Sequence, residues 1–162
     1  MTGTIITAVI TTSAVCTGVA GGVYFAFSAM VMPALRSLPA SRAVPAMQHI
    51  NRSAVRLPFM VVFFGGALAS LATLIMELTS GAGAPTSPSR IVGSGLALAA
   101  FGVTIVRNIP LNNALALIPP HALDIDERWN TFSRAWSLAN HARVTAAVAA
   151  TVILADSLAR SA

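Results

Sequence analysis

Polar side chains that could bind or convert a ligand occur in three short segments of a mostly apolar sequence. They are amides, histidines, a tryptophan and an arginine: Gln48, His49, Asn51, Asn108, Asn112, Trp136, Asn140, His141 and Arg143. Small-molecule sites are typically apolar in their body, with a few polar groups that orient the ligand. If the fold brings these segments to one end of a helix bundle, they predict such a pocket, to which Tyr24 and Trp129 would add aromatic surface.

Arg143 is the strongest single candidate because of its place in the last apolar segment. A stripe at steps of three or four residues runs through Trp129, Phe132, Trp136, Asn140, Arg143 and Ala147. Such a stripe faces partner helices, so we expect Arg143 inside the bundle, with His141 one residue off the stripe. A buried arginine is costly unless paired or hydrated, which marks a functional candidate. The equally weighted alternative is an interfacial anchor beside tryptophans.

The segment Arg107–Asn113 follows the third apolar stretch directly. Pro110 removes a backbone donor and disfavours helical geometry at Ile109. Carbonyls freed near a membrane need partners within the protein or in a water-filled cavity. The segment therefore predicts either a helix break closed by its own asparagines or the polar floor of a pocket.

The elements that position these residues follow from composition. The chain has 162 residues, 56% hydrophobic and 9% charged, with a mean hydropathy of +0.76, whereas soluble domains carry about 25% charged residues. A membrane-crossing helix needs about 20 residues. Apolar stretches occupy about 5–32, 57–78, 90–108 and 143–159. We predict an all-α, integral membrane four-helix bundle, forming a single domain over residues 1–162.

Two further helical features are expected outside the apolar stretches. A short interfacial helix between the first and second spans should begin near Pro45, since proline is tolerated in a first turn. The fourth helix should be long, because Asp124 and Glu127 have the spacing of a capping pair and the pattern continues to about Ala159.

The charge distribution predicts the orientation in the membrane. All ten basic residues are arginine, and eight lie in the first and third loops. Cytoplasmic loops collect basic residues, so we expect these loops in the cytoplasm and both termini outside, in the plasma membrane if the source is bacterial. The net charge of +5 then reflects topology. With no basic run interleaved with aromatics, we expect a lipid bilayer and no nucleic acid as partner.

Cysteine and glycine usage points to packing. One cysteine, Cys16, excludes an internal disulfide framework and is expected to pack as a small side chain. Gly18, Gly21 and Gly22 allow close approach of helices, within one bundle or in a homo-oligomer.

The polar segments resemble those of the DUF1772 family, also called the anthrone oxygenase-like family. Asn108-Ile109-Pro110-Leu111-Asn112 is similar to its Asn-x-Pro-x-Asn signature, and Trp136 to Arg143 is similar to its Trp…Asn-x-x-Arg signature. Pro33-Ala34-Leu35 followed by Gln48-His49-Ile50-Asn51 fits its first-loop pattern. The resemblance extends over nearly the whole chain.

This resemblance implies an oxygenase that oxidises an apolar polycyclic phenol or anthrone with O2, without a metal or other cofactor. His49 or His141 would then act as base, while Asn140 and Arg143 would stabilise the substrate oxyanion. The remaining candidates would bind substrate: Trp136, Trp129, Asn108, Asn112, Gln48, Asn51 and Tyr24.

Two other classes of function stay open at this point. His49, His121 and His141 could ligate a metal or haem, although no two share a helical i, i+3 or i, i+4 spacing. A non-catalytic binder of small molecules, or a subunit that packs against another protein, would need no base. Family likeness alone does not transfer a substrate.

Overall fold

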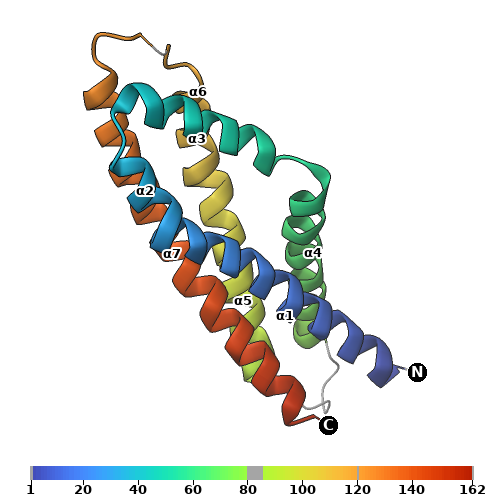
Figure 1. The fold of residues 1–162 in the computed structure, drawn as a ribbon. Coiled ribbons are helices and arrows are strands. Elements are labelled where there is room, and N and C mark those ends of the chain that lie inside the picture. Colours follow the sequence, from blue (N-terminus) through green and yellow to red (C-terminus); the bar gives the residue numbers. More distant parts are fainter. Residues whose placement is uncertain (1, 80–85, 120, 162) are drawn as a thin grey trace.

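The computed structural model describes residues 2–79, 86–119 and 121–161, and all regular secondary structure in these residues is helical. Figure 1 shows the bundle, with α3 and α6 at one end, here called the α3 end, and both termini at the other. The helices are α1 (Thr2–Ala26), α2 (Met32–Arg36), α3 (Ala40–Ala54), α4 (Leu57–Thr79), α5 (Pro88–Val103), α6 (Ile109–Ala116) and α7 (Ile125–Ala159).

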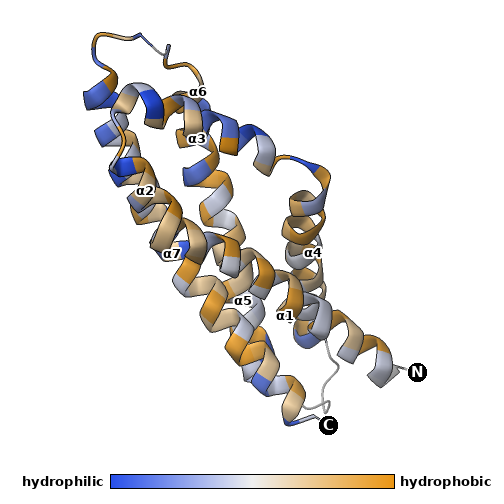
Figure 2. Ribbon diagram, in the orientation of Figure 1, coloured by the Kyte–Doolittle hydropathy of each residue, from blue (hydrophilic) through white to orange (hydrophobic). Residues whose placement is uncertain are grey.

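Four helical rods are long and apolar enough to cross a membrane. They are Gly3–Arg36, Leu57–Thr79, Pro88–Ala116 and Ile125–Ala159. Apolar residues predominate along these helices (Figure 2), and many of them are exposed: Leu57 and Leu68 on α4 are 76% and 66% exposed. A soluble protein rarely exposes such a continuous apolar surface, whereas lipid covers it without cost. The predicted all-α membrane bundle is confirmed.

The transmembrane core depends on small residues at helix contacts. The helix α7 packs along α5 and α1, and α4 packs against α1 and α5. A Cβ atom added at Gly93 on α5 would lie 2.8 Å from Cγ of Leu154 on α7, so only glycine permits this approach. Gly66 on α4 packs against Cys16 on α1 in the same way, in line with the packing role expected for Cys16.

Two spans contain a widened π-helical turn just before a proline. The turns are Phe27–Val31, before Pro33, and Thr104–Asn108, before Pro110. A proline ring lacks an N–H donor and collides with the carbonyl one turn earlier, and a π turn relieves this conflict by adding a residue. The helices therefore continue through both prolines. Pro33, which the first-loop pattern includes, lies inside the first span, and the helix break expected at Pro110 is wrong.

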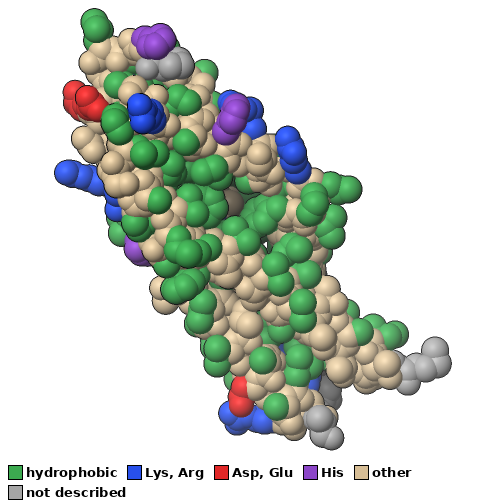
Figure 3. Space-filling view, viewed as in Figure 1, with side chains coloured by type: hydrophobic (Ala, Val, Ile, Leu, Met, Phe, Trp, Pro, Cys, Tyr) green, Lys and Arg blue, Asp and Glu red, His purple; other side chains and the backbone are tan. Residues whose placement is uncertain are grey.

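The interfacial helix α3 lies across one end of the bundle (Figure 1). It begins at Ala40, not near Pro45, because the N–H groups of Arg42 and Ala43 already donate to the Pro39 carbonyl. Pro45 is inside the helix. The arginine and histidine side chains gather mainly around this end of the molecule (Figure 3).

The fourth span is the long helix predicted from the sequence. It begins one residue after Asp124. The expected capping pair is wrong, however, because the Asp124 carboxylate accepts from Arg128 Nε at 2.7 Å instead of capping the backbone. This ion pair, at an exposed surface, lowers the pKa of Asp124 below its ordinary value.

Candidate functional site

The side chain of Arg143 lies inside the bundle, where it is 6% exposed. Its guanidinium Cζ is 4.1 Å from the ring centroid of Tyr24 and 5.1 Å from that of Trp136. Nε donates to Asn140 Oδ1 at 2.8 Å, and Nη1 donates to the Thr104 hydroxyl at 3.3 Å. The prediction that the α7 stripe turns Arg143 inward is confirmed.

No carboxylate forms an ion pair with Arg143 within the described ranges. The ion pairs found there join Arg90 to Glu77, Arg128 to Asp124 and Arg160 to Asp156. Burying a charge without a counter-ion is costly. The Arg143 charge is instead distributed over two aromatic faces, an amide oxygen and a hydroxyl, which leaves it able to attract an anion.

Asn140 connects α7 to α1. It is fully buried, and its Nδ2 donates to the Tyr24 carbonyl at 2.9 Å and to the Ser28 hydroxyl at 2.7 Å. Its Oδ1 accepts from Arg143. One amide thus holds the Tyr24 backbone and the Arg143 side chain in a fixed relation, which sets the spacing between the phenol ring and the guanidinium.

The predicted asparagines of the third span also meet α7. Trp136 Nε1 donates to Asn112 Oδ1 at 2.8 Å, and Asn108 Nδ2 donates to the Trp136 carbonyl at 3.4 Å. Asn108 is 1% exposed, yet its Oδ1 has no hydrogen-bond partner. An unsatisfied buried acceptor costs about 1–3 kcal/mol, so a donor group on a ligand would be stabilised there.

Three other predicted residues lie elsewhere at the α3 end. Gln48 Nε2 donates to the carbonyls of Leu115 and Ile118, beyond the end of α6. Trp129 stacks on Phe132 within the apolar core beneath α3. The Nδ2 of Asn51 is buried without a partner. Gln48 and Trp129 thus hold helices together, and a substrate-binding role for them stays a prediction.

Both candidate bases lie on the outside of the molecule. His49 is exposed on α3, where Nδ1 contacts the Arg52 guanidinium, and His141 is exposed on α7. Neither imidazole belongs to the buried cluster around Arg143, which comprises Arg143 with Tyr24, Ser28, Thr104, Trp136 and Asn140. His121 is exposed as well, and within the described residues no group of three His, Cys, Asp or Glu could hold a metal ion.

Sequence reasoning missed one member of the buried cluster. Thr104 lies four residues before Asn108. A polar residue one turn from another polar residue, inside an otherwise apolar helix, was the available signal. Whether such a residue joins a buried cluster depends on which helix packs alongside, and the sequence pattern alone does not show this.

Comparison with known proteins places the chain in a family. The family model described as anthrone oxygenase matches residues 59–153, more than half of the chain. This chain belongs to the anthrone oxygenase family. The match spans Asn108, Asn140 and Arg143, so the family expected from the motifs is confirmed, while the first-loop motif lies outside the matched residues. No curated protein and no solved structure matches the chain.

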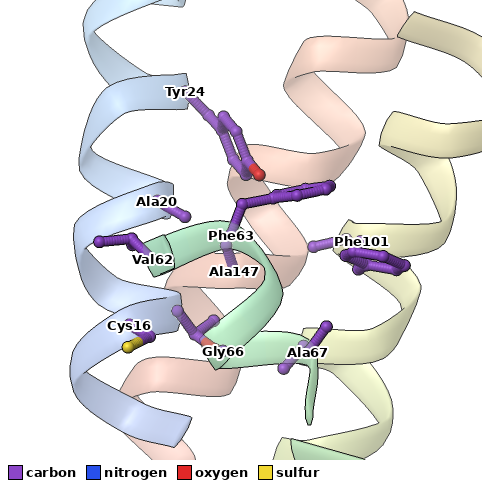
Figure 4. Close-up of a pocket in the computed structure, with 12 residues that line it drawn as sticks. Cys16, Ala20, Tyr24, Val62, Phe63, Gly66, Ala67, Phe101 and Ala147 are labelled. Carbon is purple, nitrogen blue, oxygen red and sulfur yellow. The ribbon is translucent and has the colours of Figure 1, made fainter. Parts of the chain in front are cut away.

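A cavity adjoins the cluster in this anthrone oxygenase family member. It lies between α1, α4, α5 and α7 (Figure 4), with about 20 Å³ of accessible space. Tyr24 and Phe63 lie at one end of it and Cys16 and Gly66 at the other. Because Tyr24 also carries the guanidinium of Arg143 on its ring, one side chain separates the apolar cavity from the buried charge.

Proposed function

We propose that the protein is a membrane-embedded oxygenase that oxidises an apolar polycyclic phenol or anthrone with O2 and needs no bound metal or flavin. The observation that carries the proposal is the buried Arg143 guanidinium, which has aromatic neighbours but no carboxylate partner among the described residues. Membership of the anthrone oxygenase family supports the reaction class.

The surroundings of Arg143 suit a planar aromatic anion. A guanidinium forms strong, charge-assisted hydrogen bonds to an oxyanion, and the rings of Tyr24 and Trp136 offer faces on which a flat ligand can stack. The unpaired Asn108 Oδ1 would accept from a phenolic hydroxyl of the substrate. Asn112 would act indirectly, by fixing the Trp136 indole through its hydrogen bond.

The proposed reaction converts an anthrone and O2 into an anthraquinone and water. A base removes one proton from the benzylic CH2, and the electron pair left behind forms an enolate whose oxygen lies at Arg143. The anion gives electrons to O2 while a carbon–oxygen bond forms, which yields a peroxide. Loss of the second benzylic proton and cleavage of the O–O bond then produce the new carbonyl and release water.

We assign the proton transfer to Tyr24. Among the described residues of the buried cluster, Tyr24 has the one titratable side chain besides that of Arg143. Its hydroxyl lies next to the Thr104 hydroxyl. The adjacent guanidinium would offset part of the cost of burying a Tyr24 phenolate. His49 and His141 remain candidate bases, but their exposed positions weigh against direct transfer at the cluster.

The orientation in the membrane is also a proposal. The arginines of the first and third loops would keep the α3 end in the cytoplasm, with both termini outside. The buried cluster would then lie toward the cytoplasmic side, and an apolar substrate would reach it from the bilayer or from the cytosol.

Oxygen uptake by the purified protein tests the function. In lipid nanodiscs, the protein should consume one O2 and form one anthraquinone per anthrone supplied, well above the rate of autoxidation. Arg143→Met should abolish the catalysed rate, whereas Arg134→Met, which removes an exposed arginine from the same helix, should retain it. Binding without turnover across a panel of anthrones and polyphenols would indicate a non-catalytic binding protein instead.

A further inference from the structure

The cavity beside Tyr24 is small for an aromatic substrate. About 20 Å³ of space is accessible inside it, far below the range of roughly 300–1,000 Å³ common for drug-sized ligands. A tricyclic substrate at Arg143 would therefore bind outside this cavity. The cavity is available for a smaller molecule.

The wall of the cavity is apolar and made largely of small side chains. Half of its lining residues are alanine or glycine: Ala20, Gly66, Ala67, Ala97, Ala100 and Ala147. Phe63 and Phe101 stack on each other at 4.6 Å between centroids and close another part of the wall. A space of this size admits about one small molecule, and because the wall is mostly apolar, an uncharged apolar molecule is the suitable occupant.

The cavity extends from the lipid-facing surface to the proposed reaction centre. Four of its lining residues, Cys16, Val62, Ala67 and Phe101, are partly exposed, whereas Tyr24 at its inner end is 3% exposed. O2 is apolar and dissolves better in hydrocarbon than in water. The bilayer would therefore supply O2 at the outer side of the cavity, one side chain away from Arg143.

From this arrangement we propose that the cavity between α1, α4, α5 and α7 is a binding site for O2 that delivers it from the bilayer to the substrate anion. The role of this site in catalysis rests on the proposed oxygenase function, whereas the binding of O2 there does not. Binding of a small apolar gas depends on the shape and dryness of the cavity, so it can be measured without turnover.

Methyl relaxation tests occupancy directly. The protein is labelled at alanine methyl groups in nanodiscs and compared under O2, which is paramagnetic, and under N2. The methyls of Ala97 and Ala100 should relax faster under O2 than that of Ala150, which is also buried but does not line the cavity. Equal O2 effects on all three methyls would overturn the proposal.

Filling the cavity tests its role in turnover. Ala100→Leu should raise the KM for O2 about tenfold while the KM for anthrone and the kcat at saturating O2 stay unchanged. The matched control is Ala99→Leu, the same substitution on the lipid-facing side of α5, which should leave all three values unchanged. Ala97→Val is a smaller filling substitution that serves if Ala100→Leu does not fold.

The two experiments separate failure of this proposal from failure of the proposed function. Selective relaxation at Ala97 and Ala100 in a protein that oxidises no anthrone would support the gas site and reject the oxygenase. Anthrone oxidation whose KM for O2 is insensitive to both filling substitutions would reject the gas site and retain the oxygenase.

Discussion

The guanidinium Cζ of Arg143 lies 4.1 Å from the centre of the Tyr24 ring, so the buried positive charge of the bundle rests on an aromatic face instead of a carboxylate. Cation–π contacts contribute up to about 2 kcal/mol when desolvated. This is less than the cost of burying an unpaired ion. An anionic ligand at this place would remove the remaining cost, and that difference is the physical basis of the proposed site.

Arg143→Lys is expected to weaken binding of an anthraquinone or phenolate ligand although it keeps the charge. A lysine ammonium lacks the planar fork that stacks between two rings while donating to several acceptors. Loss of charge-assisted hydrogen bonds worth about 1.5–3 kcal/mol corresponds to roughly 10–100-fold in Kd. Isothermal titration calorimetry in nanodiscs measures this change in Kd, and an unchanged Kd would mean that the ligand binds elsewhere.

Tyr24→Phe should distinguish the two assignments of the base. The substitution keeps the ring that carries Arg143 and removes the hydroxyl, so kcat should fall by about 10²–10⁴-fold, the usual contribution of a general base, while ligand binding persists. His49→Gln and His141→Gln should retain near-normal kcat because both imidazoles are exposed. The opposite pattern in single-turnover kinetics would return the base role to a histidine.

Asn140→Ala should destabilise the bundle more than Ser28→Ala. The first removes donors to the Tyr24 carbonyl and to Ser28, together with the acceptor of Arg143 Nε, whereas the second removes a single partner. A hydrogen bond between membrane helices contributes about 0.6 kcal/mol on average. The double-mutant cycle should therefore give a coupling of about this size, measured by reversible unfolding in mixed micelles.

Gly93→Ala and Gly95→Ala form a matched pair on α5. A Cβ at position 93 would overlap Leu154, while a Cβ at position 95 meets nothing within 4 Å. Overpacking in a core costs about 1–3 kcal/mol, so Gly93→Ala should lower the free energy of unfolding and the Tm. Gly95→Ala should be neutral or slightly stabilising. Equal Tm values for the two variants would mean that α5 and α7 are not packed closely enough for a Cβ at position 93 to overlap Leu154.

The spans and the inward arginine could be predicted from the sequence, because hydropathy and helical periodicity act along one chain. Arg143 and Asn140 follow from spacing on a single helix. The contacts of Asn140 with Tyr24 and Ser28 could not be predicted, since they depend on which helix packs beside α7. His141 shows the same limit: a rotation of about 100° per residue takes it off the stripe, but whether it then faces solvent or a neighbouring helix depends on the packing of the bundle, and it is exposed.

The helix geometry at the prolines could not be predicted, because a missing backbone donor is compatible with either a helix break or a widened turn. Pro45 lies inside α3, and Pro33 and Pro110 follow π turns. The choice depends on whether the helix beyond the proline has a packing partner. Here α2 packs against α3, and α6 packs against α3 and α7, which favours continuation.

Each π turn also changes the helical phase of its span. One extra residue offsets everything beyond the turn by about 100° relative to a regular α-helix. The residues of α6 therefore cannot be assigned to faces by counting from α5, and the same holds for α2 and α1. Deleting one residue within 104–108 would restore a regular helix but rotate α6 away from α7, separating Asn112 from the Trp136 indole. The alignment of these two residues is thus maintained by an extra residue that contributes no side chain of its own to the contact.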